Sequence, residues 1–330
     1  YEGIGSDIAE SYNGIQDGTP VVSMPYVQMD ITDKASVEKV LTEVNADAVI
    51  HCAAWTAVDL AEDEDKKDKV HAVNAEGTKN IAEVCKKLDS KMVYTSTDYV
   101  FNGQGEEPWQ PDCKDYQPLN VYGQSKLDGE LAVSETLDKY FIVRIAWVFG
   151  KNGNNFIKTM LKVGKNHDKL RVVNDQIGTP TYANDLAQAI FAAINKGVVR
   201  GIYHFSDEGV CSWYDFTIAI HRLAGIASCK VKPLHTADYP AKAPRPHYSV
   251  LDKTKIKDTF GKGQLMQEEN NENEQAGTYT VDGLTYQYSY VKSEQESDVE
   301  ELGFQIAKFI FDDCGDMTLA SSEKKEREER

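Results

Sequence analysis

The chain has 330 residues, 41% of them hydrophobic, and carries a formal net charge of −17. This length allows two domains, and the apolar content is sufficient for a sizeable core. Because nucleic acids and anionic membranes repel a strongly acidic protein, we expect neither as a partner. The most apolar stretch, 140–150, is too short to span a bilayer and is interrupted by Arg144.

The N-terminus and the cysteines indicate where the protein works. The first ten residues have neither a basic start nor an apolar run, so no signal peptide is expected. The six cysteines are far apart and form no CxxC pair. This pattern argues against a zinc site, and a reduced, cytoplasmic protein is the simplest interpretation.

Strand-like and helix-like segments alternate up to about residue 261. Strands are expected at 1–7, 46–54, 91–101 and 140–150, and helices at 36–45, 74–87 and 121–137. This alternation predicts βαβ units and a parallel sheet, hence an α/β fold. Ligands of such sheets bind beyond the carboxyl ends of the strands. The residues at those positions are Asp7, Asp30, 53–59, 97–101 and Trp147.

The segment LNVYGQSK (119–126) places Tyr122 and Lys126 one helical turn apart, on the same face of the expected helix. A free phenol has a pKa of about 10 and exchanges protons poorly near neutrality. A neighbouring ammonium stabilises the phenolate, so we expect Lys126 to lower the pKa of Tyr122. The pair is suited to moving a proton onto or off a sugar or alcohol oxygen, although a Y-x-x-x-K spacing also occurs by chance.

The preceding strand strengthens this interpretation, because VYTSTDYVF (93–101) ends in the small hydroxyl residues Ser96 and Thr97. A hydroxyl there can hydrogen-bond the reacting oxygen beside the phenol. A hydroxyl at a strand end followed by YxxxK on the next helix resembles the short-chain dehydrogenases/reductases.

A more specific resemblance covers residues 1 to about 261. The segments that carry it, in order, are HCAAWTAVDLAEDE (51–64), STDYVFNG (96–103), PLNVYGQSKLDGE (118–130), NNFIKTML (154–161), NDQIGTPTYANDLA (174–187), GIYHFSDEGVCSWYDF (201–216) and YPAKAPRPHYSVLD (239–252). They resemble the dTDP-4-dehydrorhamnose reductase family. The resemblance implies a Rossmann-type, doubly wound parallel sheet with a smaller α/β substrate domain. It also implies reduction of a dTDP-4-keto-6-deoxy sugar to dTDP-L-rhamnose with NADPH or NADH, for cell-wall and surface polysaccharides.

The resemblance also implies roles for individual residues. Tyr122 would protonate the keto oxygen, Lys126 would hold the nicotinamide ribose, and Thr97 would hydrogen-bond the substrate oxygen. The residues expected along the sugar pocket are Asp98, Tyr99 and Trp147. Ala53, Ala54 and Trp55 are expected to bring their own backbone close to the cofactor. Asp30 and Ile31 are expected near the adenine, and Asp7 at the adenosine ribose hydroxyls. An acid at Asp7 favours NADH over NADPH.

Several of these residues have simpler interpretations. Asp30 could cap the helix at 36–45, although Thr32 or Asp33 suits that position better. Trp147 could belong to the core. Trp213 is expected to pack at the start of a helix capped by Ser212. Arg245 could pair with the substrate diphosphate or support its own loop.

The sequence departs from the family at its start. No glycine-rich phosphate loop is present, and the acid of a Rossmann unit follows that loop by about 20 residues. If Asp7 is that acid, the loop belongs before Tyr1, and we expect an N-terminally truncated chain that lacks the first β-α unit. The neighbours of the absent strand would then have exposed edges.

The chain also departs from the family at its end. Residues 262–330 contain 17 acidic and 7 basic residues and match no part of the family. A hairpin at 278–291 followed by apolar residues at helical spacing from 299 to 310 suggests a small ββα module. We therefore expect a dinucleotide-binding domain at 1–150 and 171–204, a substrate-binding domain at 151–170 and 205–261, and an acidic tail at 262–330.

Three functions remain open from the sequence. The first is the 4-keto reductase, acting on a nucleotide sugar, and a homodimer is compatible with it. The second is another sugar-nucleotide epimerase or dehydratase, but a dehydratase needs an acid after Asp98, where this chain has Tyr99. The third is a non-catalytic, cofactor-binding regulatory subunit, which can retain the tyrosine and the lysine. The acidic residues that hold magnesium between subunits in the family lie in its C-terminal portion, which has no match here, so we predict no metal.

Overall fold

The structure is a computed structural model that describes residues 2–11, 25–197, 200–261, 274–281 and 284–291. Its strands are β1 Gly5–Asp7, β2 Tyr26–Gln28, β3 Ala48–His51, β4 Lys91–Thr97, β5 Tyr140–Ile145, β6 Val148–Phe149, β7 Lys169–Val173, β8 Ile177–Gly178, β9 Thr181–Tyr182, β10 Gly201–His204, β11 Cys211–Ser212, β12 Lys230–Leu234, β13 Glu274–Val281 and β14 Leu284–Val291. Its longer helices are α1 Lys34–Val44, α3 Gly77–Leu88, α4 Val121–Thr136, α5 Phe156–Asn166, α6 Ala183–Asn195 and α7 Trp213–Leu223. Short helices are η1 Leu60–Glu62, α2 Lys67–His71, η2 Ala72–Glu76, η3 Asp98–Val100, η4 Thr236–Asp238 and α8 Thr254–Phe260.

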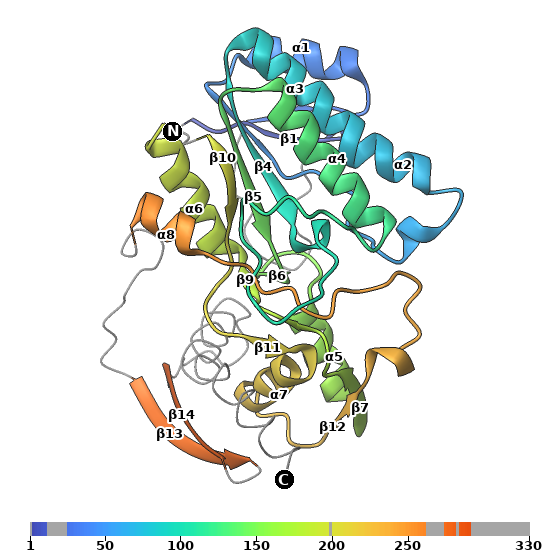
Figure 1. The fold of residues 1–330 in the computed structure, drawn as a ribbon, viewed down its shortest axis with the longest axis vertical. Coiled ribbons are helices and arrows are strands. Elements are labelled where there is room, and N and C mark those ends of the chain that lie inside the picture. Colours follow the sequence, from blue (N-terminus) through green and yellow to red (C-terminus); the bar gives the residue numbers. More distant parts are fainter. Residues whose placement is uncertain (1, 12–24, 198–199, 262–273, 282–283, 292–330) are drawn as a thin grey trace.

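A parallel sheet of order β10-β5-β4-β3 forms the centre of the molecule. Helices α1, α3 and α4 cover one face and α6 and α8 cover the other (Figure 1). Because β4 and β5 are buried on both faces, their sequences read as nearly continuous apolar runs rather than alternating ones. The predicted α/β fold with a doubly wound parallel arrangement is confirmed.

Strands β1 and β2 form a separate parallel pair. The sequence placed Asp30 just after a strand but did not predict the bounds of β2, which has only three residues. Among the described residues, β1 pairs only with β2 and β3 only with β4, so each has one unpaired edge. Ile50 of β3 is 42% exposed.

A second group of elements packs around α5 and α7, with β7 pairing in parallel with β12 and β8 antiparallel with β11. The expected boundary at residue 171 falls inside β7. Residues 171–173, which we expected in the dinucleotide-binding part, pair instead with β12 in the part expected to bind substrate. The boundary expected at residue 171 stays a prediction, and this pairing places 171–173 in the same strand as 169–170.

Polar side chains begin the helices where the sequence indicated. Asp33 caps α1 by accepting from the Ala35 amide at 3.0 Å. Ser212 caps α7 in a capping box with Asp215. The helix expected at 74–87 differs in its first turn, which is a π-helical turn, η2. Such turns often occur at functional sites.

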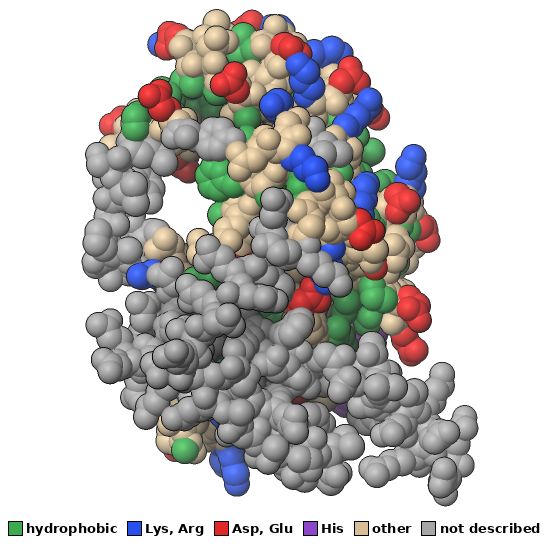
Figure 2. Space-filling view, turned by 90° about the vertical axis from the view of Figure 1, so that its left-hand side faces the viewer, with side chains coloured by type: hydrophobic (Ala, Val, Ile, Leu, Met, Phe, Trp, Pro, Cys, Tyr) green, Lys and Arg blue, Asp and Glu red, His purple; other side chains and the backbone are tan. Residues whose placement is uncertain are grey.

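In the acidic tail, β13 and β14 pair antiparallel in the register of a hairpin, as the alternation at 278–291 indicated. The helix expected at 299–310 lies outside the described residues. On the described part of the face in Figure 2, acidic and basic side chains are interspersed without a continuous basic area. No helix in the described ranges has the length and apolarity needed to cross a membrane.

Candidate active site

Helix α4 lies along β4 so that Tyr122 and Lys126 meet the end of this strand. The Thr97 side chain acts on the Tyr122 hydroxyl as a neighbour that lowers its pKa, and Lys126 Nζ donates to the Thr95 carbonyl oxygen at 2.7 Å. The step from Tyr122 to Lys126 along α4 is about 6 Å, and the step from Thr97 to Thr95 along β4 is about 6.6 Å. The two contacts therefore have matching spacings on the helix and on the strand. The predicted Tyr122–Lys126 face is therefore directed at the strand end that carries Thr97.

Two glycines allow this close approach. A Cβ on Gly123 would lie 2.4 Å from the Tyr99 carbonyl oxygen, and one on Gly129 would lie 2.4 Å from the Tyr94 hydroxyl. Real Cβ contacts are essentially never this short. The glycines of YGQSKLDGE therefore determine how near the helix comes to β4.

The pKa of Tyr122 differs from the sequence-based expectation. Burial raises the pKa of Tyr122 to about 12; the Thr97 side chain opposes this shift and the Asp98 carboxylate adds to it. Lys126 is not enough to overcome the burial, because its Nζ donates to the Thr95 carbonyl rather than to the Tyr122 hydroxyl. The expected lowering of the Tyr122 pKa by Lys126 is thus wrong for this structure.

Lys126 is held deep inside the site. It is 3% exposed, and its Nζ lies 4.1 Å from the centroid of the Tyr94 ring. Burial lowers the pKa of Lys126 to about 7, while the charge of Glu130 acts in the opposite direction. The lysine is therefore close to half ionised at neutral pH.

The Asp98 carboxyl group lies beside the hydroxyls of Thr97 and Tyr122. Its Oδ1 accepts from Thr97 Oγ1 at 3.0 Å. Oδ2 is buried without a partner at hydrogen-bond geometry among the described residues. Burial raises the pKa of Asp98 to about 6, although the Ser249 side chain is close enough to lower the pKa of the carboxyl. The Tyr99 ring lies edge-on to Tyr122 with centroids 5.7 Å apart. Thr97, Asp98, Tyr99 and Tyr122 thus lie together, as the sequence predicted.

The segment after β3 is fixed by a residue that sequence reasoning missed. Asn74 accepts from the Trp55 amide at 2.7 Å and donates to the Trp55 carbonyl at 3.1 Å and to Ser125 Oγ at 2.9 Å. It therefore joins the predicted cofactor segment to α4, with Ala53 exposed and Ala54 half-buried. A signal was available, because Asn74 is a polar residue on an otherwise buried helical face.

The loop around Arg245 closes one side of the site. Arg245 Nη2 lies 2.9 Å from Asp59 Oδ2, and the Ala243 amide donates to Asp59 Oδ1 at 3.0 Å. The same loop receives a hydrogen bond from Asn120, the N-cap of α4, at the Pro244 carbonyl. These contacts show the supporting role considered for Arg245, and diphosphate binding stays a prediction.

Trp147 has a strained backbone and a stacked side chain. Its φ of 51° lies in the left-handed region, which is uncommon for a residue with a side chain. Its ring stacks on Trp213 with centroids 3.6 Å apart, and a Cβ on Gly178 would come within 2.8 Å of it. The ring is half-buried, so it has both the core contacts and the partial exposure that the sequence left open.

The remaining predicted cofactor residues lie at the ends of β1 and β2. Asp7 is exposed and accepts from the Ala9 amide at 3.2 Å. Asp30 accepts from the Thr32 amide and hydroxyl at 2.9 and 2.7 Å. Ile31 packs against Gly77 and the core of the α1, α3, α4 face. No described contact joins Asp7, Asp30 or Ile31 to Tyr122, so their adenosine role stays a prediction.

The relation to known proteins agrees with this geometry. Residues 3–273 match the family model described as RmlD substrate binding domain. The dTDP-4-dehydrorhamnose reductase of Aggregatibacter actinomycetemcomitans is 40% identical over 251 residues, covering 73% of this chain and 84% of that protein. The chain belongs to the dTDP-4-dehydrorhamnose reductase family. Its match extends past residue 261, where the sequence analysis expected it to end.

Two further relatives support membership of the dTDP-4-dehydrorhamnose reductase family. The spore coat polysaccharide biosynthesis protein SpsK of Bacillus subtilis is 39% identical, covering 74% of this chain and 84% of that protein. The dTDP-4-dehydrorhamnose reductase of Bacillus anthracis, solved in complex with NADP, has a TM-score of 0.69 with this fold and 37% sequence identity. That comparison covers 78% of this chain and 92% of the other.

Proposed function

We propose that this protein reduces the 4-keto group of dTDP-4-dehydro-L-rhamnose to give dTDP-L-rhamnose, with NADPH or NADH as the reductant. The observation that carries the proposal is the position of Tyr122 beside Thr97 at the carboxyl end of β4, with Lys126 one turn along α4 and bonded to the Thr95 carbonyl. Family membership supports the same activity.

Each residue has a defined task in this reaction. The Thr97 hydroxyl, next to Tyr122, positions the keto oxygen beside the phenol. Because the pKa of Tyr122 is raised, its hydroxyl is protonated throughout the neutral range, which is the form a reduction requires. As the proton leaves, the Lys126 ammonium about 6 Å along the helix stabilises the phenolate. Asp98, bonded to Thr97, stays a predicted residue of the sugar pocket.

The nicotinamide end of a dinucleotide fits the residues present. A reduced nicotinamide supplies the hydride when it is bound. Ala53 and Ala54 present small side chains there, Asn74 fixes the adjoining Trp55 backbone, and Lys126 is available for a ribose hydroxyl. The pyrophosphate end has no G-x-G-x-x-G turn to hold it anywhere in the 330 residues. The proposal for the cofactor therefore rests on the nicotinamide side of the site.

Other functions receive less support. Elimination of water by a dehydratase needs an acid after Asp98, and Tyr99 has instead a pKa raised by burial. A regulatory subunit would not require Tyr122 to lie beside Thr97. We propose a cytoplasmic enzyme, and the homodimer stays a prediction.

Oxidation of NADPH and of NADH, followed by absorbance with dTDP-4-dehydro-L-rhamnose, tests this function. Wild-type protein should oxidise at least one of the two cofactors, NADPH or NADH, and should do so only when the keto sugar is present. Tyr122→Phe removes the proton donor but keeps the ring against Tyr99, and should lower kcat about 100-fold or more. A Phe variant with a near-native rate would remove the proposed mechanism. Turnover of a glucose-configured sugar nucleotide alone would favour the dehydratase.

A further inference from the structure

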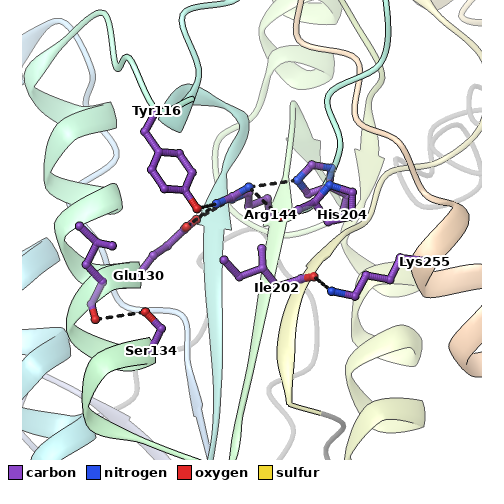
Figure 3. Close-up of polar contacts among 9 residues, drawn as sticks. Tyr116, Glu130, Ser134, Arg144, Ile202, His204 and Lys255 are labelled. Atoms are coloured by element: carbon purple, nitrogen blue, oxygen red, sulfur yellow. Dashed lines mark hydrogen bonds and ion pairs between the residues drawn. The ribbon is translucent and has the colours of Figure 1, made fainter. Parts of the chain in front are cut away.

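A buried ion pair lies one helical turn beyond Lys126. Glu130 of α4 is 1% exposed and Arg144 of β5 is fully buried. Arg144 donates from Nε to Glu130 Oε1 at 2.9 Å and from Nη2 to Oε2 at 2.7 Å (Figure 3). Residues four apart share one helical face, so Tyr122, Lys126 and Glu130 form a row along α4.

Further contacts hold the Arg144 guanidinium in place. Nη2 donates to the Tyr116 hydroxyl at 3.1 Å, and Nη1 lies 3.4 Å from His204 Nε2 (Figure 3). Burial and the charge of Arg144 keep the pKa of His204 well below its ordinary value, so that ring is neutral. Glu130 is therefore the charged partner of Arg144 in this cluster, and both of its oxygens are fixed.

Stability alone gives a weak reason for such a pair. Taking two charges out of water costs several kcal/mol each, and well-packed apolar residues often stabilise a fold equally well. The location of Glu130 suggests another role, because its charge acts on Lys126. Burial works against a charged lysine, and a carboxylate one turn away works for it.

The other groups that face Lys126 offer little compensation. On β4 it meets the Tyr94 ring and the Thr95 carbonyl. At the end of β3, burial lowers the pKa of His51 to about 3, so the ring is neutral, and desolvation raises the pKa of the Cys52 thiol. On α4 itself, Tyr122 is protonated at neutral pH. Among the described residues, Glu130 is the carboxylate that acts on Lys126.

We propose that Glu130, fixed by Arg144, is a positioning residue that increases the fraction of Lys126 present as ammonium one turn from Tyr122. The consequence for the reduction rests on the function proposed above, whereas the charge of Lys126 can be measured without substrate. Lys126 then stabilises the phenolate over a wider pH range than its burial alone would allow.

The first test is an NMR titration of the Lys126 side chain in protein with isotope-labelled lysine, assigned with Lys126→Met. Glu130→Gln keeps the shape of the side chain but removes its charge, and should lower the titration midpoint of Lys126 by about one pH unit or more. Asp128→Asn is the matched control, because it removes a charge from the same helix at a carboxylate whose side chain is 31% exposed. Solvent screens that charge, so the midpoint should move much less.

An unchanged midpoint in Glu130→Gln, or an equal shift in Asp128→Asn, would overturn the proposal. If Glu130→Gln does not unfold cooperatively, and is therefore not properly folded, the titration is done with the double variant Glu130→Gln/Arg144→Met. This variant leaves no unpaired buried charge. Its midpoint should also fall below that of the wild type, because Arg144 contacts Glu130 rather than Lys126.

The second test is the pH profile of kcat. In Glu130→Gln the alkaline fall in kcat should begin about one pH unit lower than in the wild type. A residue needed only for folding would reduce kcat equally at every pH, and that result would contradict the proposal. Absence of turnover in the wild type would refute the proposed function instead, and the NMR titration would still decide the charge of Lys126.

Discussion

The closest backbone contact at the site predicts the effect of Gly123→Ala. The new Cβ would lie 2.4 Å from the Tyr99 carbonyl oxygen and 3.2 Å from its carbon, where ordinary contacts begin at 3.4 Å. Both are backbone atoms and cannot rotate away. The first turn of α4 must therefore move by about 1 Å, and Tyr122, the adjacent residue, moves with it relative to Thr97.

The rate should fall more than the stability. Misplacing a reacting group by about 1 Å can cost about 100-fold in rate, or about 2.7 kcal/mol of activation free energy. Alanine gains about 1 kcal/mol over glycine in a helix, while overpacking costs about 1–3 kcal/mol. The free energy of unfolding should therefore fall by no more than about 2 kcal/mol.

The measurements are kcat from keto-sugar-dependent NADPH oxidation and the free energy of unfolding from urea titration. Gln124→Ala is the control, because Gln124 is the next residue, is exposed, and bonds only along the helix surface to Asp128 in the described contacts. Its kcat should stay near the wild-type value. A wild-type kcat in Gly123→Ala, or an equal loss in Gln124→Ala, would show that the close approach of α4 does not position Tyr122.

Three further predictions concern the surroundings of the site. Asn74→Ala removes the hydrogen bonds that hold the segment after β3, and steady-state kinetics should show a KM for NADPH raised about tenfold with a smaller change in kcat. Arg245→Ala should raise the KM for the nucleotide sugar about tenfold or more if the guanidinium binds the diphosphate, whereas Asp59→Ala frees the same loop contact and should raise it less; equal effects contradict a binding role. Burial raises the pKa of Asp207 from 3.8 to about 8, so the folded state binds the proton more tightly than the unfolded state and loses stability as pH rises through that window. Asp207→Asn should therefore increase the free energy of unfolding by about 1 kcal/mol or more near pH 9 and little near pH 4 in urea titrations, and a gain independent of pH would contradict this account.

Local patterns were sufficient to predict the centre of the site. Tyr122 and Lys126 are one turn apart on a helix, and Thr97 ends the strand before it, so helix and strand periodicity together place all three on one side of α4. The caps Asp33 and Ser212 were also predictable, because a cap is a contact between neighbours in the chain.

Contacts between distant residues could not be read in the same way. Asn74 and Ser125 are 51 residues apart, and Glu130 and Arg144 belong to different elements whose packing no local pattern specifies. The strand β2 is only three residues long and pairs with β1 across an intervening segment, so its bounds could not be predicted from periodicity. The pairing of β7 with β12 could not be predicted from the sequence either, because it joins segments about 60 residues apart.

The pKa of Tyr122 shows why spacing alone cannot predict acid–base behaviour. The sequence placed an ammonium one turn from a phenol, and in water that pair would lower the pKa of the phenol. In the fold both groups are buried, so desolvation acts on each in the direction of its neutral form. The neutral phenol is the proton donor that a reduction needs, but a neutral lysine could not stabilise the phenolate that the reduction leaves. A buried anion at Glu130 resolves this conflict, because it opposes the desolvation of Lys126 while Arg144 balances its own charge.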